Sequence, residues 1–510
     1  MRAQTPSYVV SVKLQLPITV ENYLEKSFHI VNSAYNEALN FGLRHFEYMK
    51  QNSTYQELLE TRRDLFQKAE KEKKTKTFKI QKKEIDKALT EIRKDYSLTE
   101  YGLSVHLSKQ RRKSCSSYKH LNSGELQVVA SQAYKTLEKV LFYQIKPDKV
   151  RFRSKFDLDV SYRNRVNNTG TRLEESNKKG IAYRLYLHKA STFVDIPVKA
   201  FNHYQQMSIL RSERIKYVQI VRKTIRGKKM YYLQIVCEGY PPAKVSKGEG
   251  VVGIDPGIST VSYVTSTEVA IVDLVPSNIN QKEKNIKYLS RRIERSRRVN
   301  NPDCYHDNGT IKKRSNFNPL SKRAQRLLNR SQKTYRSLSE ERKKLQGKLI
   351  THLVSQASVI KIEELNVKGL QKRAKDIRIN PKTNRPFRNK RFGKSIFRAA
   401  PSTFREALRK RADQLGIELV MISPKDVKPS QYNHISKTFE KKSLSTRIFD
   451  LSPEWTGIQR DLYSAFLIRN IENNHYKQKN LEEDFPNFYT QMKDFLQQPR
   501  QTKRLSWYLS

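Results

Sequence analysis

Residues 251–260 read VVGIDPGIST. A short apolar run leads directly into an acid, Asp255, and Gly257 follows two positions later. Such a run, bounded by Asp-Pro-Gly, is typical of a buried strand that ends in a turn. Gly257 would leave room there for a backbone or a metal-bound phosphate. The same residues also form ordinary β-turns, so this stretch alone leaves the role of Asp255 open.

Two later stretches have a similar character. Residues 359–370 read VIKIEELNVKGL, in which an apolar strand delivers Glu363. Strand side chains alternate between faces, so Glu363 and its neighbour Glu364 point to opposite sides. Residues 459–470 read QRDLYSAFLIRN and place Asp461 at the start of an amphipathic helix. An acid in a first helical turn often only stabilises the helix dipole.

Together the three acids favour metal-dependent chemistry. Hydrolysis of a phosphodiester needs an activated water and neutralisation of the leaving oxygen, which two divalent ions about 3.5–4 Å apart supply. Mg²⁺ and Mn²⁺ prefer carboxylate oxygens that converge from separate elements. We therefore predict that Asp255, Glu363 and Asp461 are the catalytic, metal-binding residues. No other cofactor site is expected.

The elements around these acids follow α/β order. Strands are expected at 251–255, 261–266 and 269–276, then a basic helical stretch at 281–355 with a break near 300–319. A strand at 358–365, a helix from Thr403 to Gly416, a strand at 417–423 and a helix from about Arg460 follow. Thr403 and Glu406 have the spacing of a capping box.

The N-terminal half has a different pattern. Residues 8–17 alternate like a strand, the chain then reads as helical to about 146, and 214–239 reads as two strands joined at Gly227. This order predicts a small β-barrel interrupted by a helical insertion. Its basic side chains suit a nucleic-acid backbone, although a plain structural β-domain fits the same pattern. A turn-rich linker at 240–250 separates the two halves.

Charge points to a polyanionic partner. The 510 residues include 100 Lys and Arg against 50 Asp and Glu, a formal net charge of +50. Such self-repulsion favours nucleic acid over a merely soluble basic surface or an anionic membrane. No apolar run approaches the ~20 residues of a membrane helix, and no signal peptide is expected. Three dispersed cysteines without a CxxC indicate a reducing, cytoplasmic setting.

In this order, the elements D-x-G, E-x-L-N-V-K-G and R-D-L-x-S-A-x-x-I resemble the three RuvC motifs of TnpB proteins. TnpB proteins are transposon-encoded relatives of the compact type V CRISPR effectors. KVRFRSK at 149–155 and KKMYYLQIVCEG at 228–239 resemble further TnpB segments. The resemblance covers about residues 8–470.

The resemblance implies a two-lobed chain: an RNase H-like (RuvC) α/β nuclease domain, plus a WED-like β-barrel with a REC-like helical insertion. The implied boundaries are 1–18 for the first barrel strand, 19–147 for the insertion, 148–243 for the rest of the barrel and 250–470 for the nuclease. Within the last, 281–355 is a basic insert and 428–458 a degenerate zinc knuckle. A tail, 471–510, receives no function.

The implied activity is RNA-guided cleavage of target DNA, in the prokaryotic cytoplasm near the nucleoid, by an enzyme associated with a transposable element. Guide RNA and target DNA are the expected partners, with no membrane. Two Mg²⁺ or Mn²⁺ ions would be held by Asp255, Glu363 and Asp461, with Glu364 outside the triad. A nuclease-silent RNA-guided binder, and a RuvC-fold nuclease or recombinase without RNA, remain alternatives.

The chain departs from the family where a four-cysteine zinc knuckle is usual. Residues 429–461 contain no cysteine, and His434 is the only good zinc-type ligand there, so we expect no zinc. Tyr432, Phe449 and Trp455 are expected to pack in its place, and His434 to lie at the surface or contact nucleic acid. The basic runs 291–298, 312–333 and 371–394 are predicted phosphate contacts.

Overall fold

The computed structural model describes residues 5–71, 76–114, 116–154, 160–187, 189–225, 227–312, 315–372, 379–381, 385–386, 392–443 and 445–498. The chain divides into two compact units, Met1–Pro242 and Ala243–Ser510. This division falls within the linker expected at 240–250. Each unit has its own hydrophobic core.

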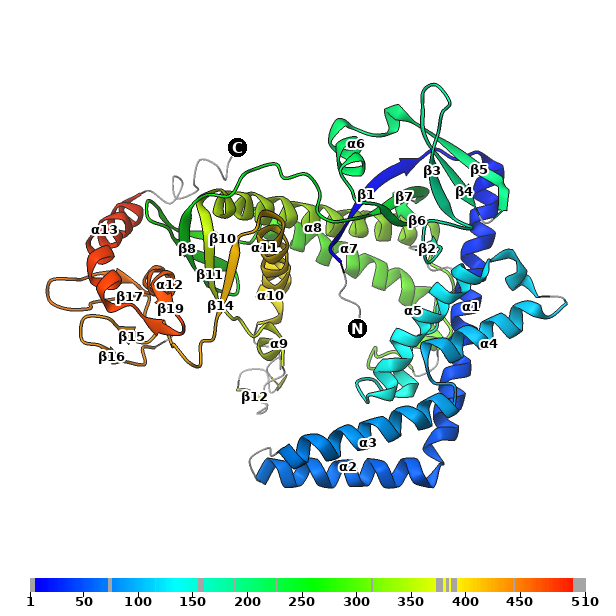
Figure 1. The fold of residues 1–510 in the computed structure, drawn as a ribbon, viewed down its shortest axis with the longest axis horizontal. Helices are drawn as coiled ribbons and strands as arrows, with labels where there is room; N and C mark the ends of the chain where they lie inside the picture. Colours follow the sequence, from blue (N-terminus) through cyan, green and yellow to red (C-terminus); the bar gives the residue numbers. More distant parts are fainter. Residues whose placement is uncertain are drawn as a thin grey trace. The chain divides into compact units, whose positions relative to one another are not determined.

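The first unit begins with a strand and continues into helices. Its helices are α1 (Ile18–Lys50), α2 (Ser53–Lys71), α3 (Lys76–Asp95), α4 (Glu100–Arg112), α5 (Ser123–Leu141) and α6 (His203–Leu210). The four-and-three spacing that predicted α1 is confirmed, because Leu24, Phe28 and Val31 are buried along one face. α2 and α3 run side by side as a helical pair (Figure 1).

The strands of this unit form two antiparallel sheets. They are β1 (Ser7–Leu14), β2 (Val160–Arg163), β3 (Arg172–Glu175), β4 (Ile181–Leu187), β5 (Lys189–Pro197), β6 (Ile215–Ile225) and β7 (Lys228–Glu238). Their orders are β1-β7-β6-β2 and β3-β4-β5. Hydrogen bonds between these described strands do not close them into one ring. The expected barrel is therefore two sheets around a shared core, which period-two patterning alone does not distinguish from a closed barrel.

The second unit is built on a five-stranded sheet of order β10-β9-β8-β11-β14. Its strands are β8 (Gly250–Pro256), β9 (Thr260–Val264), β10 (Val269–Asp273), β11 (Ala357–Glu363) and β14 (Glu418–Ile422). β9 runs antiparallel to both β10 and β8, whereas β11 runs parallel to both β8 and β14. The predicted strands are confirmed. The parallel pairs bring the carboxyl ends of β8 and β11 to one edge of the sheet.

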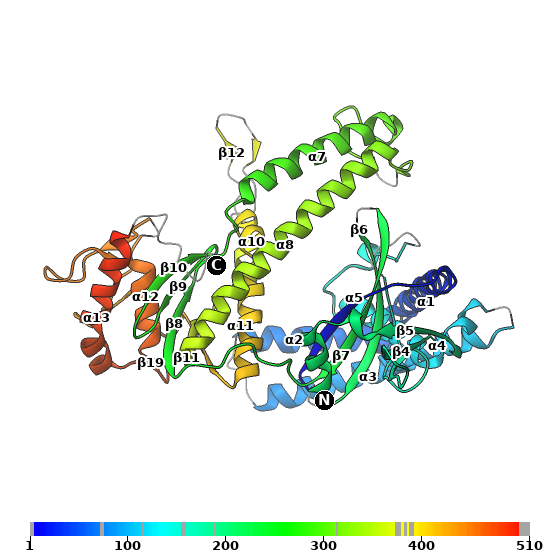
Figure 2. The ribbon, with the colours of Figure 1, turned by 90° about the horizontal axis from the view of Figure 1, so that it is seen from above.

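Helices cover both faces of this sheet (Figure 1). They are α7 (Ile279–Val299), α8 (Lys322–Gln356), α9 (Val367–Leu370), α10 (Gly393–Ala399), α11 (Pro401–Leu415), α12 (Arg460–Arg469) and α13 (Gln478–Gln497). α8 and α11 pack on one face, and α12 on the other with α13 beside it. α7 and the first half of α8 form a hairpin that projects from the sheet (Figure 2), with the predicted break between them.

The predicted start of α11 is wrong. The helix begins at Pro401, and Glu406 pairs with Arg409 and Lys410 on the helix surface instead of completing a capping box. Pro at the first helical position needs no N–H partner, so it outcompetes Thr403 as the start. The predicted end is confirmed, since Gly416 adopts a left-handed φ of 62°.

The segment between β14 and α12 contains only short hairpins. They pair β15 (Tyr432–Asn433) with β16 (Thr438–Phe439), and β17 (Ile448–Phe449) with β18 (Ile458–Gln459). The remaining short pairs are β12 (Ile379–Asn380) with β13 (Arg385–Pro386), and β19 (Ile471–Glu472) with β20 (His475–Tyr476).

α13 lies in the tail to which the sequence assigned no function. Its apolar face is buried in the core of the second unit, through Leu481, Phe485, Phe488, Met492 and Phe495. The helix is thus part of the packed unit that contains the sheet.

Candidate active site

Two neighbouring strands carry the first two predicted acids. β8 and β11 are parallel, with Gly253 opposite Lys361 and Ile254 opposite Ile362. One further residue along this register brings Asp255 opposite Glu363. Side chains in register on adjacent parallel strands point to the same face. Asp255 and Glu363 therefore lie side by side, on the face that α12 covers.

The helix α12 carries the third acid and lies very close to β8. A Cβ on Gly253 would lie 2.2 Å from the backbone oxygen of Ala465 and 2.5 Å from the backbone nitrogen of Arg469. Only glycine permits this approach. Asp461 is one turn before Ala465, about 6 Å along the helix. Asp255 is two residues beyond Gly253, about 6.6 Å along the strand.

The electrostatics of Asp255 show that the three acids influence one another. Burial raises the pKa of Asp255 well above its ordinary value, and the charges of Glu363 and Asp461 raise it further. Its side chain keeps some accessible surface but is densely surrounded by protein. The guanidinium groups of Arg460 and Arg447 oppose this rise in pKa. Burial also raises the pKa of Glu363, to about 7.

Asp461 is held by two arginines. Nη1 of Arg447 lies 2.9 Å from its Oδ2, and Nη2 of Arg460 lies 3.0 Å from its Oδ1. Arg447 comes from the β17–β18 hairpin, where its carbonyl accepts a hydrogen bond from the Arg460 backbone N–H. Sequence reasoning missed both arginines, since Arg447 lies in the degenerate knuckle segment and carries no motif of its own.

The three carboxylates are hard oxygen donors, the type that Mg²⁺ and Mn²⁺ bind. Their mutual repulsion, which raises the pKa of Asp255, is an interaction that a bound cation would relieve. At the same time, the described residues contain no group of three or more His, Cys, Asp or Glu side chains arranged to hold a metal ion. The three carboxylates are thus chemically suitable ligands for Mg²⁺ or Mn²⁺, while Asp461 forms ion pairs with two arginines in this structure.

Glu364 lies outside this group of acids. Its side chain is exposed, and its backbone N–H donates to the carbonyl of Ile422 on β14. Strand alternation places it on the opposite side from Glu363.

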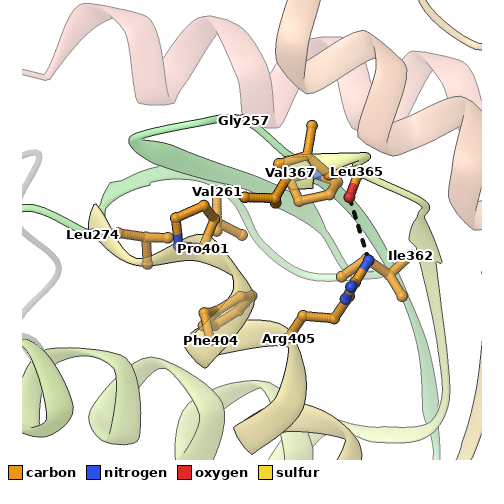
Figure 3. A pocket seen from close by; sticks show the side chains of 10 residues that line it. Gly257, Val261, Leu274, Ile362, Leu365, Val367, Pro401, Phe404 and Arg405 are labelled. Atoms are coloured by element: carbon orange, nitrogen blue, oxygen red, sulfur yellow. Dashed lines mark hydrogen bonds between the residues drawn. The ribbon is translucent and has the colours of Figure 1, made fainter. Parts of the chain in front are cut away.

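A small apolar pocket supports the loops that follow β8 and β11 from the other face of the sheet (Figure 3). Ile362, Val367 and Phe404 line it. Arg405 of α11 donates a hydrogen bond to the carbonyl of Leu365 across 3.3 Å. The apolar side chains that line the pocket are suited to packing. They therefore hold the carboxyl ends of β8 and β11 in place from the face of the sheet opposite to the acids.

The structure corrects the prediction for His434, which is neither at the surface nor available to nucleic acid. It is 2% exposed, its Nδ1 lies 2.7 Å from the hydroxyl of Tyr463, and its ring packs on Phe485 at 4.5 Å. Burial lowers its pKa to about 4, so the ring is neutral near pH 7. Tyr463 belongs to α12, so a buried aromatic cluster braces the acid-bearing helix.

The aromatic packing expected in place of zinc is present. Tyr432 stacks on Tyr476 with ring centroids 4.0 Å apart. Phe449 contacts Tyr463, and Trp455 contacts Phe485. Such contacts bury apolar area and hold the segment in place.

Basic side chains are concentrated on the α7–α8 hairpin. Both helices carry runs of Arg and Lys. Arg292 lies over the exposed ring of Tyr288, and Arg298 over the half-buried ring of Tyr305. The runs 291–298 and, apart from 313–314, 312–333 lie on this hairpin and its loop. Much of 371–394 lies outside the described residues, so its predicted phosphate contacts are untested. Within the described part of the chain, we find no helix with the length and apolarity needed to cross a bilayer.

No protein-family model and no curated protein matches the chain. Among solved structures, Cas12f1 bound to sgRNA and target DNA is 13% identical with a TM-score of 0.43, over 91% of this chain and 99% of that one. A CRISPR-Cas12f ternary complex is 12% identical with a TM-score of 0.26, over 90% and 86%. A Cas12i variant with crRNA and dsDNA is 8% identical with a TM-score of 0.27, over 93% and 65%.

These three are CRISPR Cas12 proteins, the class to which the motif resemblance relates this chain; TnpB is not named among them. Identities and TM-scores this low do not establish a shared fold or activity. The TnpB assignment therefore stays a prediction that depends on the residues.

Proposed function

We propose that this chain is an RNA-guided, metal-dependent DNA endonuclease of the TnpB type, associated with a transposable element. The observation that supports it best is that the charges of Glu363 and Asp461 both raise the pKa of Asp255, although the three acids come from elements more than 90 residues apart in sequence. A five-stranded sheet with strand acids at one edge is what a RuvC-type, RNase H-like domain requires.

In this proposal, Asp255, Glu363 and Asp461 hold two Mg²⁺ or Mn²⁺ ions. When bound, the ions neutralise charge on the phosphodiester and activate a water. The protein supplies orientation: Asp255 and Glu363 are fixed by strand pairing, and Asp461 by the packing of α12. Arg447 and Arg460 place two positive charges beside the acids, where they suit a DNA phosphate.

Guide RNA and target DNA are the proposed partners. A net charge of +50 is appropriate for holding a heteroduplex through its phosphates. The Cas12f1 structure matched above was solved with sgRNA and target DNA. The basic α7–α8 hairpin is the surface of the second unit best suited to such phosphate contacts.

One observation favours a second candidate, a nuclease-silent RNA-guided DNA binder. Asp461 is occupied by two arginines, and the described residues contain no ready-made metal cluster. A binder of this kind would use the same basic surfaces without cleavage. All three acids are nevertheless present, which favours the nuclease.

The test begins with purified full-length chain and the RNA that co-purifies with it. Sequencing this RNA identifies the guide and hence a matching DNA. We expect cleavage of that DNA with Mg²⁺, and none by Asp255→Ala, which should keep its RNA. Full activity without RNA would overturn guidance, and undiminished cleavage by Asp255→Ala would remove Asp255 from the mechanism. RNA-dependent DNA binding without cleavage by the unmodified chain would select the silent binder.

A further inference from the structure

Lys361 is an unusual residue at its position. It lies in the middle of β11, between two parallel neighbours, and is only 8% exposed. An ammonium group buried in a sheet is costly unless its N–H groups are hydrogen-bonded. Its Nζ donates to the carbonyl of Arg469 at 3.0 Å and to that of Ile471 at 2.6 Å. Both acceptors lie at the carboxyl end of α12.

This contact fixes one end of the helix that carries Asp461. The carboxyl end of a helix leaves carbonyl groups without intrahelical partners and carries a partial negative charge. From the sheet beneath, Lys361 satisfies one of these groups, the carbonyl of Arg469, and also the carbonyl of Ile471, which follows the helix. Because its partners belong to α12 and the following residues, Lys361 keeps its hydrogen bonds only while α12 stays in this position.

The residue opposite Lys361 on the neighbouring strand also lets α12 approach the sheet closely. Lys361 pairs in register with Gly253, where a Cβ would collide with the backbone of Ala465 and Arg469. The positive charge of Lys361 and the lack of a Cβ at Gly253, on adjacent strands, thus define where α12 lies along the sheet.

Gly253 and Lys361 lie close to the candidate metal ligands, on the same two strands. Asp255 and Glu363 are each two residues further along the strands that carry Gly253 and Lys361, about 6.6 Å away. Metal–ligand distances tolerate deviations of about 0.2 Å. A shift of α12 by ~1 Å would therefore remove Asp461 from the ligand set while leaving the two strand acids in place.

We propose that Lys361, together with Gly253, is a positioning residue that sets where α12 presents Asp461 to Asp255 and Glu363. This inference rests on the proposed function, because it concerns ligation of divalent ions by the same three acids. It goes beyond that function by assigning a role to a residue that contacts neither DNA nor metal. A lysine with a purely structural role would stabilise the unit without affecting the affinity for the ion.

The test measures Mn²⁺ binding to the full-length chain, without substrate, from the EPR signal of free Mn²⁺. Lys361→Met keeps the length of the side chain and removes its charge. We expect its Mn²⁺ affinity to fall about 10- to 100-fold, the range found when groups that orient metal ligands are removed. Lys247→Met is the matched control: exposed Lys247 also donates to a carbonyl at a helix end, that of Gly416, but it precedes β8, whereas Asp255 is near the carboxyl end of that strand. Its affinity should equal that of the unmodified chain.

Gly253→Ala provides a second, independent variant in case Lys361→Met does not fold. The added methyl should displace α12 and lower Mn²⁺ affinity by a similar factor. Gly347→Ala, where an added Cβ meets no atom within 4 Å, is its control and should leave the affinity unchanged.

The outcomes separate the inference from the proposed function. The positioning role alone would be overturned if Asp255→Ala lowers the Mn²⁺ affinity and folded Lys361→Met leaves it unchanged. If Lys361→Met does not fold, unchanged affinity in Gly253→Ala would have the same meaning. Unchanged affinity in Asp255→Ala itself would overturn the proposed metal site. Lower affinity in Lys361→Met and Gly253→Ala, with both controls unchanged, would support positioning.

Discussion

Two acids, Glu125 in the first unit and Asp255 in the second, have opposite surroundings. Glu125, at the start of α5, is 1% exposed and accepts hydrogen bonds from the Asn122 backbone N–H at 2.9 Å, the Tyr162 hydroxyl at 2.7 Å and the Thr171 hydroxyl at 2.8 Å. Asp255 instead faces Glu363 and Asp461, which share its charge. Burial raises the pKa of both acids.

This difference separates a structural acid from a candidate functional one. The donors around Glu125 lower its pKa, in opposition to burial, and stabilise its carboxylate within the fold. The acids around Asp255 destabilise its charged form and so favour the binding of a cation. Removal of each acid should therefore have opposite consequences for stability.

The largest expected effect concerns Asp255. Asp255→Asn should lower cleavage at least ~10²- to 10³-fold, because a metal ion contributes several kcal/mol to the transition state. Without divalent ions, the variant should unfold at the same temperature as the parent or higher, since like-charge repulsion is relieved. Single-turnover cleavage and thermal unfolding in EDTA measure the two. A lower unfolding temperature would contradict the repulsion.

Glu125→Ala should have the reverse profile. It leaves the hydroxyls of Tyr162 and Thr171 without their acceptor and opens a cavity, at a cost of about 2–4 kcal/mol in the free energy of unfolding. Amide exchange in α5 and chemical denaturation measure this loss. Glu138→Ala, an exposed site on the same helix, should change stability by no more than ~0.5 kcal/mol. Equal losses of stability in the two variants would contradict a structural role for Glu125.

The pH dependence of folding stability, through Glu363, gives a further test of the acids in the second unit. Its pKa is raised to about 7 in the fold, above the ordinary value of 4.5. A carboxyl with a raised folded pKa stabilises the fold fully below pH 4.5, and this contribution is lost as the pH rises through 7. In EDTA, the unfolding temperature of the parent should thus fall relative to Glu363→Gln between pH 5 and 8. Glu364→Gln, next to it and exposed, should follow the parent; a Glu363→Gln curve parallel to the parent would reject the raised pKa.

The smallest expected effect is that of Arg447→Ala on stability. The Arg447 side chain is 61% exposed, so its ion pair with Asp461 should contribute less than ~1 kcal/mol to folding. Thermal unfolding at low and high salt measures this contribution. A larger, salt-insensitive loss would show that Arg447 has a packing role in the hairpin.

Much of the second unit was predictable because apolar runs mark its strands directly. The runs at 251–255 and 358–363 lie on β8 and β11. Strand alternation put Glu363 and Glu364 on opposite faces, and the motif resemblance selected Glu363. Parallel pairing of these strands, however, joins segments about 100 residues apart, and nothing local in the sequence encodes it. The side-by-side position of Asp255 and Glu363 therefore came from the structure.

Other features escaped prediction for identifiable physical reasons. A single histidine gives no periodic signal, so the burial of His434 beneath α13 could not be inferred. Lys361 carries no signal in the sequence, because its partners are backbone carbonyls far along the chain. Backbone acceptors leave no trace in residue identity. Strand patterns carry no information on closure, so the arrangement of the first unit's strands in two sheets came from the structure.

The packing of α13 has a consequence for the order of synthesis. Phe485 and Phe488 cover Phe466 of α12, so the helix that bears Asp461 acquires its outer layer only after residues 478–497 have been made. At ~5–20 residues per second, a ribosome needs a second or more to pass from Asn470 to Gln497, and these residues must then leave the exit tunnel. A nascent chain whose first unit is already complete therefore still lacks the outer layer of the helix that carries Asp461.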